Sequence, residues 1–408
     1  MLKLASIACR NVLRNTRRTA LTLVVISFGV ASLLLAGGFC AYNYEGLRET
    51  TIRNGLGHLQ VFTAAYLAEG EERPLAHGIA DYEALQARLE AEEHVVATTA
   101  QVGFVGLVSN GEKSEPFLGA GVDVTREALM GFSLNVLDGE PLYEEDGQQV
   151  LLGTGLAESL DLGVGDLVTL MATTSDGALN AIDAEVVGLF STGVREMDLR
   201  SLRLPLATAQ GLLDAERVTK VIVKLDATAH TGEVAGRLAA GGLAAGGAPL
   251  EVRSWEELAP FYKQVVALYN AIFLFVGLII AVLVVLSTSN TMMMAVFERV
   301  REIGTLMALG TRRRQVLGIF VLEGMVIGVL GGALGLALSW GLIELINGAG
   351  ITMPPPPSFS RGIPLLVKLV PELFAAVFAL VVGLQTLSAV LPALRGARMT
   401  IVDALGHV

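Results

Sequence analysis

Charge is segregated along this chain in a way that restricts the folds open to it. Residues 43–265 contain 15 Lys and Arg against 34 Asp and Glu, a net charge of −19, whereas the rest of the chain contains 14 basic and 6 acidic residues. The basic residues outside 43–265 lie beside long, uncharged, apolar stretches. Basic residues next to membrane-spanning segments stay in the cytoplasm, while a long acidic domain crosses freely. The pattern predicts a membrane protein with a large external domain.

Four apolar segments are long enough to cross a bilayer as helices. The first, Ala20 to Ala41, is uncharged, and 22 residues give a helix of about 33 Å. The predicted order begins with an amphipathic cytoplasmic helix at 1–19, a span at 20–42 and an external α+β domain at 43–264. A span at 265–288 then returns the chain to a cytoplasmic loop at 289–315. A span at 316–346, a short proline-rich external loop at 347–372, a span at 373–394 and a cytoplasmic tail at 395–408 complete it. Four spans return both ends to the same side of the membrane.

The first span has an alternative interpretation as a cleaved signal, because basic residues precede it. Its apolar run exceeds the roughly 7–15 residues of a signal peptide, and the triplet directly before Tyr42, Phe39-Cys40-Ala41, is not a convincing small-x-small cleavage site. The run from Leu35 to Cys40 resembles a lipoprotein cleavage box, but the bulky Phe39 directly before the cysteine does not fit one. We therefore expect an uncleaved anchor.

The external domain alternates short β-rich runs with helical stretches, which predicts an α+β fold. The expected strands are Val102–Val108, Phe117–Val122, Val150–Leu152, Leu167–Met171, Ala184–Phe190 and Val218–Leu225. Helices are expected at 82–92 and 206–214, and 241–247 is expected to be a flexible loop. Both cysteines lie outside this domain, so its core alone must stabilise it.

The cytoplasmic loop contains a short amphipathic pattern at 295–309. Apolar residues recur at helical spacing in one stripe, made of Val296, Val300, Ile303 and Met307. Charged residues lie off the stripe: Glu298, Arg299, Arg301 and Glu302. Gly310 is placed to end the helix, Thr311 to cap the next one, and Arg312–Arg314 to anchor the third span. The pattern predicts a docking element, although a plain surface helix has the same periodicity.

The third span carries glycines at four-residue spacing, Gly324, Gly328 and Gly332, with Gly331 and Gly335 offset from them. This spacing lets helices approach closely, within a bundle or across a dimer. Glu323 lies in the same span, and we favour a structural polar contact over a proton relay for it. The run Pro354–Pro357 predicts a stiff external loop.

No motif of an enzyme is present. The five histidines form neither an H-E-x-x-H motif nor an i, i+4 pair, and no G-x-S-x-G occurs. The dipeptide Gly-Lys is absent, so the chain has no phosphate-binding loop of the G-x-x-x-x-G-K-[ST] type. We expect no catalysis, no metal and no cofactor in this chain itself.

Three segments together resemble the FtsX/MacB-type permease family of ABC transporters. They are the entry Arg10-Asn11-Val12-Leu13-Arg14-Asn15, the stretch from Glu298 to Gly310 followed by Arg312-Arg313-Arg314-Gln315, and the ending Pro392-Ala393-Leu394-Arg395-Gly396-Ala397-Arg398. The layout is similar to that of the lipoprotein-releasing permeases LolC and LolE. The resemblance implies a MacB-like periplasmic core with an inserted lobe.

The resemblance also implies a role for each part. The helix at 295–310, including Leu309, would be the coupling helix that docks on a separate cytoplasmic ATPase, expected in two copies and carrying ATP and Mg²⁺. A second permease chain, identical or homologous, would complete the complex in the bacterial inner membrane, with both termini cytoplasmic. ATP hydrolysis would drive extraction of a lipoprotein or other amphiphile from the outer leaflet or periplasm, a process called mechanotransmission. Acyl-chain contacts are expected between the first two spans, at Phe28, Leu34, Phe39, Tyr269 and Phe273.

Two alternatives remain open at this stage. One is MacB-like efflux of a peptide, lipid or drug. The other is FtsX-like regulation of a periplasmic cell-wall hydrolase, for which an external domain of over two hundred residues is larger than expected. No nucleic-acid partner is expected.

Overall fold

The computed structural model describes residues 16–69, 75–132, 134–144, 147–354 and 363–398. The expected amphipathic helix at 1–19 falls almost wholly outside these residues, as do the tail beyond 398 and most of Pro354–Pro357. The chain divides into two compact units. One contains the apolar helices, and the other consists mainly of Gly46–Gln264.

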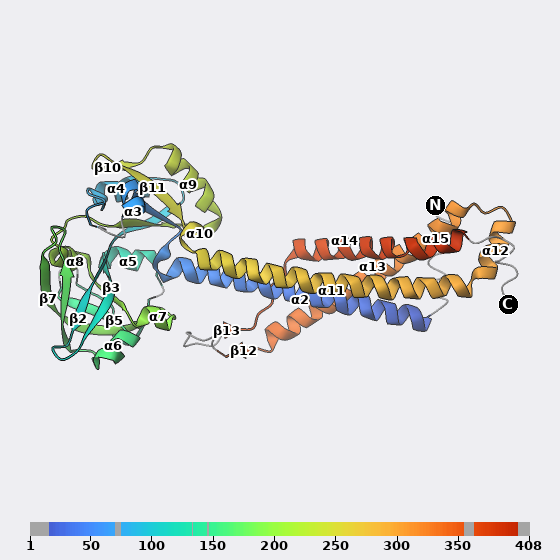
Figure 1. Ribbon diagram of the computed structural model, residues 1–408, viewed down its shortest axis with the longest axis horizontal. Coiled ribbons are helices and arrows are strands. Elements are labelled where there is room, and N and C mark those ends of the chain that lie inside the picture. Colours follow the sequence, from blue (N-terminus) through green and yellow to red (C-terminus); the bar gives the residue numbers. More distant parts are fainter. Residues whose placement is uncertain (1–15, 70–74, 133, 145–146, 355–362, 399–408) are drawn as a thin grey trace. The chain divides into compact units, whose positions relative to one another are not determined.

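The membrane unit is built from helices that run alongside one another (Figure 1). Its helices are α2 (Thr16–Thr51), α11 (Pro260–Glu298), α12 (Val300–Ala308), α13 (Arg313–Gly348), α14 (Pro371–Ser388) and α15 (Val390–Arg398). Strands β12 (Thr352–Met353) and β13 (Ile363–Pro364) pair antiparallel in the loop before α14. Within the described residues, four helical stretches are long and apolar enough to cross a membrane, at Thr16–Leu56, Pro260–Glu298, Arg313–Gly348 and Pro371–Arg398.

The helices are longer than the predicted spans. The second helix runs on to Glu298 instead of ending near 288, so it takes in the first part of the expected cytoplasmic loop. The continuation is explained by packing, since Met292 and Val296 are buried there and no Gly or Pro interrupts 289–298. The fourth segment is interrupted at Ala389, which separates α14 from α15.

The external unit contains two lobes, and the first has ferredoxin-like topology. Strands β1 (Leu59–Thr63), β2 (Val95–Ser109), β9 (Lys220–Leu225) and β11 (Ala248–Ser254) form an antiparallel sheet in the order β11-β1-β9-β2. With helices α4 (Tyr82–Glu90) and α9 (Thr231–Ala240), the chain order is β-α-β-β-α-β. The remaining elements of this lobe are α3 (Ala64–Glu69), the 3₁₀ helix η2 (Thr228–His230), β10 (Ala244–Ala245) and α10 (Trp255–Leu258), and a π-helical turn η1 (Ile52–Leu56) leads in from α2.

The second lobe is inserted between β2 and β9 and closes into a barrel. Its elements are β3 (Ser114–Val122), α5 (Val124–Met130), β4 (Asn135–Gly139), β5 (Gln149–Gly153), α6 (Thr154–Leu160), β6 (Leu167–Thr173), β7 (Leu179–Ser191), α7 (Arg195–Asp198), β8 (Ser201–Pro205) and α8 (Leu206–Leu213). Pairing runs β2-β3-β8-β5-β7-β6 and returns from β6 to β2. The long strand β2 therefore serves both lobes, and one buried apolar core extends through them.

The α+β prediction is confirmed, and each expected strand overlaps an observed one. The expected helices correspond to α4 and α8. Strands β1, β4, β8 and β11 were not predicted, and the stretch 241–247, predicted as a flexible loop, contains the short strand β10 paired with β11.

Candidate functional site

The candidate site is the helical corner formed by the end of α11, α12 and the start of α13. The helix expected at 295–310 is not continuous, because Arg299 has φ −113° and ψ 15° and separates α11 from α12. Gly310 ends α12 with a left-handed φ of 94°, a conformation that suits glycine. The prediction of Thr311 as the N-cap of the next helix is wrong by one residue, because Arg312 occupies the N-cap of α13. The backbone N–H of Arg312 donates to Gln315 Oε1 at 2.9 Å.

The apolar stripe of the corner faces inward, so the docking element predicted at 295–309 cannot use this stripe as its contact face. Val296, Val300, Ile303 and Met307 are at most 9% exposed. Val296, Ile303 and Met307 form one apolar cluster with residues of α13 and α15, namely Val316, Phe320, Ala393 and Ala397. A partner protein therefore cannot reach this stripe without opening the corner.

Ion pairs tie the corner to the neighbouring helices. Arg299 Nη1 lies 3.1 Å from Glu323 Oε1 on α13, and Arg299 Nε lies 3.1 Å from Glu302 Oε2. The Glu323 side chain is 5% exposed, so the pair is shielded from solvent. Arg18 on α2 joins Glu298 at the end of α11, with Nη2 2.8 Å from Oε1. Glu323 thus makes a structural contact that holds the corner to α13.

The outward face of α12 combines charge with exposed leucines. Arg301, Glu302 and Thr305 are exposed on it. Leu306 and Leu309 are 42% and 80% exposed. Two exposed leucines, one on α12 and one directly after it, are rimmed by charged side chains, which suits contact with another protein.

The glycines of α13 lie on two different faces. A Cβ on Gly324, Gly328 or Gly332 would meet α14 or the residue that follows it, at Ala389, Gln385 and Phe378 respectively, within 2.9 Å. A Cβ on Gly331 or Gly335 would instead meet Ile26 or Val30 of α2, at 2.8 and 2.5 Å. The glycines therefore hold α13 between α2 and α14 within one chain.

The five side chains expected to contact acyl chains do not share one surface. Leu34 is fully buried in the core of the helix bundle, and Phe273 packs against that core. Phe28 is 61% exposed, Tyr269 is 36% exposed, and Phe39 is half-buried. Leu34 therefore cannot meet a lipid or an acyl chain in this conformation, and Phe28 and Tyr269 are the most accessible of the five.

The external unit contains a large polar cavity that the sequence did not indicate. Its volume is about 1030 Å³, and its lining includes Arg48, Glu49, His58, Lys224, Trp255 and Tyr262. His58 Nδ1 accepts a hydrogen bond from the backbone N–H of Leu225 at 3.1 Å, which leaves the proton on Nε2, 3.3 Å from Thr228 Oγ1. Thr228 Oγ1 in turn donates to Glu49 Oε1 at 3.3 Å. Burial lowers the pKa of His58, although Glu49 opposes this effect.

Comparison with protein families matches both parts of the chain. Residues 19–240 match the MacB-like periplasmic core domain, and residues 273–401 match the FtsX-like permease C-terminal domain. The first match covers more than half of the chain.

Individual relatives have the same organisation at low identity. The lipoprotein-releasing system transmembrane protein LolE of Haemophilus influenzae is 26% identical, over 79% of this chain and 76% of that protein. The uncharacterized ABC transporter permease YvrN of Bacillus subtilis is 23% identical over the whole of both chains. The macrolide export ATP-binding/permease protein MacB of Escherichia coli is 23% identical over 81% of this chain, which spans about half of that protein.

Proposed function

The chain belongs to the FtsX/MacB-type family of ABC transporter permeases, and we propose that it converts ATP hydrolysis by a separate ATPase subunit into release of lipoproteins from the membrane. Permeases of this family work with a cytoplasmic ATPase. In the proposed complex two ATPase copies hold the ATP and Mg²⁺, and a second permease chain, identical or homologous, completes the transmembrane part.

The observation that carries the proposal is the construction of the α12 corner. Its buried stripe packs on α13 and α15, and Arg299 pairs with Glu323 of α13. A force applied to the outward face of α12 would therefore be passed to α13 and, through its glycine contacts, to α2 and α14. Helices α2 and α11 continue from the membrane unit into the external unit. Movement of the bundle would therefore reach the external unit, and the substrate would not need to pass through a channel in the membrane.

Lipoprotein release is favoured among substrates by the similarity to LolE, which extends over most of both chains. Efflux of a small molecule or peptide of the MacB type is the alternative outcome. Exposed aromatic residues on the first two spans, Phe28 and Tyr269, are available to acyl chains of a lipoprotein. The polar cavity of the external unit would more readily suit a polar headgroup or peptide.

The ATPase contact is tested with substitutions on the outward face of α12. We expect Leu306→Asp with Leu309→Asp to abolish co-purification of the ATPase from native membranes in mild detergent. Leu179→Asp is the matched control, because Leu179 is 75% exposed on β7 of the external unit, and it should leave co-purification intact. Normal ATPase recovery from the α12 variant would overturn the proposed docking face.

The substrate is tested separately from the ATPase contact. Purified complex in vesicles should release a bound acylated lipoprotein on addition of ATP and Mg²⁺, and the unacylated form should show no ATP-dependent release. If ATP drives transport of a macrolide or peptide but leaves the acylated protein bound, the efflux alternative replaces lipoprotein release while the permease assignment stands.

A further inference from the structure

Three titratable side chains of the external unit converge at a place that the proposed transport mechanism does not use. His94 lies in the turn between α4 and β2, Asp226 directly follows β9, and His230 ends the 3₁₀ helix η2 ahead of α9. Strands β2 and β9 are antiparallel neighbours in which Val95 pairs with Leu225. The backbone N–H of Asp226 also donates to the carbonyl of His94 at 3.1 Å, so the backbone holds the first two residues together.

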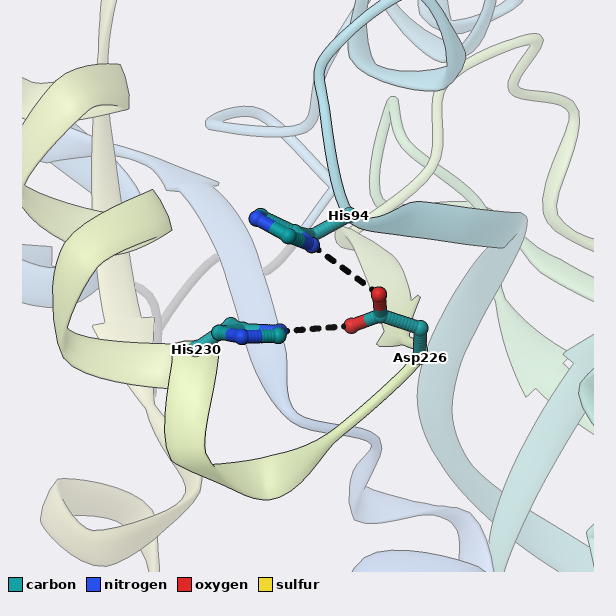
Figure 2. A group of neighbouring side chains, drawn as sticks. All are labelled: His94, Asp226 and His230. Carbon is teal, nitrogen blue, oxygen red and sulfur yellow. Dashed lines mark hydrogen bonds and ion pairs between the residues drawn. The ribbon is translucent and has the colours of Figure 1, made fainter.

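Both imidazoles point at the same carboxylate (Figure 2). His94 Nδ1 lies 2.9 Å from Asp226 Oδ2, and His230 Nδ1 lies 2.8 Å from Asp226 Oδ1. The two rings stack with centroids 3.8 Å apart and an interplanar angle of 26°. His94 holds a left-handed backbone conformation with φ 73°, which is unfavourable for a non-glycine residue and is maintained by its surroundings.

We propose that His94, Asp226 and His230 bind one divalent transition-metal ion of the zinc class. One ligand atom from each residue lies within 4.8 Å of the other two. Ligands at about 2.0–2.2 Å from a tetrahedral ion are separated by roughly 3.4 Å, so small side-chain movements are enough. Two imidazoles and one carboxylate suit zinc and its neighbours better than Mg²⁺ or Ca²⁺, which prefer oxygen ligands.

An imidazole that is already neutral would bind the ion without gaining or losing a proton. Each ring would move its proton from Nδ1 to Nε2, and the ion would take the place of the two hydrogen-bonded protons beside Asp226. Water would complete the coordination. The side chains are 23%, 45% and 34% exposed for His94, Asp226 and His230, so the ion has access from solvent.

The ion would fasten a loop that also lines the polar cavity. Asp226, Ala227, Thr228 and Thr231 are part of the cavity wall. Thr228 joins this loop to His58 and to Glu49 near the end of α2. A metal bound at Asp226 and His230 would therefore hold the loop against β2 and restrict the movement of this wall.

The test uses the full-length protein without a polyhistidine tag, stripped with EDTA and titrated with ZnCl₂. We expect one Zn²⁺ per chain, a rise in the melting temperature on addition of Zn²⁺, and d–d absorption bands when Co²⁺ is used instead. His94→Ala and His230→Ala should each weaken Zn²⁺ binding by at least about tenfold. His77→Ala is the matched control, a histidine of the same unit that should leave binding unchanged.

A second variant guards against loss of folding. Asp226→Asn preserves the size of the side chain and one of its acceptor oxygens, so it should keep the circular dichroism spectrum while weakening Zn²⁺ binding. Absence of Zn²⁺ binding to the unaltered protein would overturn the proposal, and so would equal affinity in the folded His94→Ala/His230→Ala variant. In either case the three residues form only a hydrogen-bonded ion pair network.

Discussion

At the scale of single residues, the glycines of α13 determine how closely its neighbours approach. We expect Gly335→Ala to destabilise the membrane unit by about 1–3 kcal/mol, because its Cβ would lie 2.5 Å from Val30 Cβ. Gly341 on the same helix has open space around it, so Gly341→Ala should leave stability unchanged or slightly raised. Unfolding in detergent with increasing SDS measures the free energy of unfolding of both variants. Equal effects of the two substitutions would show that helix propensity, and not close approach, sets the result.

His58 should make the stability of the external unit depend on pH. Burial lowers the pKa of His58 below its ordinary value of 6.5, so the folded protein favours the neutral ring. The stabilisation is complete above the unfolded pKa and is lost as the pH falls below 6.5 toward the folded pKa, since the unfolded chain then binds more protons. The melting temperature should fall between pH 7.5 and 5.5, and less steeply in His58→Gln. An unchanged slope in that variant would assign the pH dependence to other groups.

At the scale of elements, the break between α11 and α12 converts one amphipathic pattern into a fastened corner. Breaking the buried Arg299–Glu323 pair should be more costly than breaking the exposed Arg18–Glu298 pair. A double-mutant cycle with Arg299→Gln and Glu323→Gln should give a coupling free energy on the order of 1–3 kcal/mol. The same cycle with Arg18→Gln and Glu298→Gln should give about 0.2–1 kcal/mol. Similar values in the two cycles would contradict a special role for Arg299.

At the scale of the whole molecule, the charge distribution predicts the side of the membrane on which each part lies. In a background with Cys9→Ser and Cys40→Ser, a cysteine replacing Ala240 should react with a membrane-impermeant maleimide in spheroplasts. A cysteine replacing Leu309 should react only after permeabilisation. Both positions are exposed, so differences in labelling report the side of the membrane. Labelling of both before permeabilisation would overturn the four-span arrangement.

Several features of the fold follow from the sequence because their physical cause is local. An uncharged run of some twenty apolar residues suits a membrane-spanning helix whatever its neighbours are. Alternation of β-rich and helical runs likewise predicts an α+β domain. Strands β1 and β8 escaped prediction because Gln60 and Arg203 interrupt their short apolar runs, whereas β5, of the same length, contains the continuous run Val150–Leu152. Their burial comes from central positions in the sheet, which depend on pairing with distant strands.

The sequence by itself determined the spans, the external α+β domain and the amphipathic character of 295–309. Only the tertiary structure decided which side of that pattern is exposed, because contacts with α13 and α15 bury Ile303 and Met307 and leave Leu306 and Leu309 outside. The same holds for His94 and Asp226, which are 132 positions apart in the chain. Helical periodicity is a local property, whereas burial and side-chain convergence depend on which distant segments pack together, here through the register of β2 with β9.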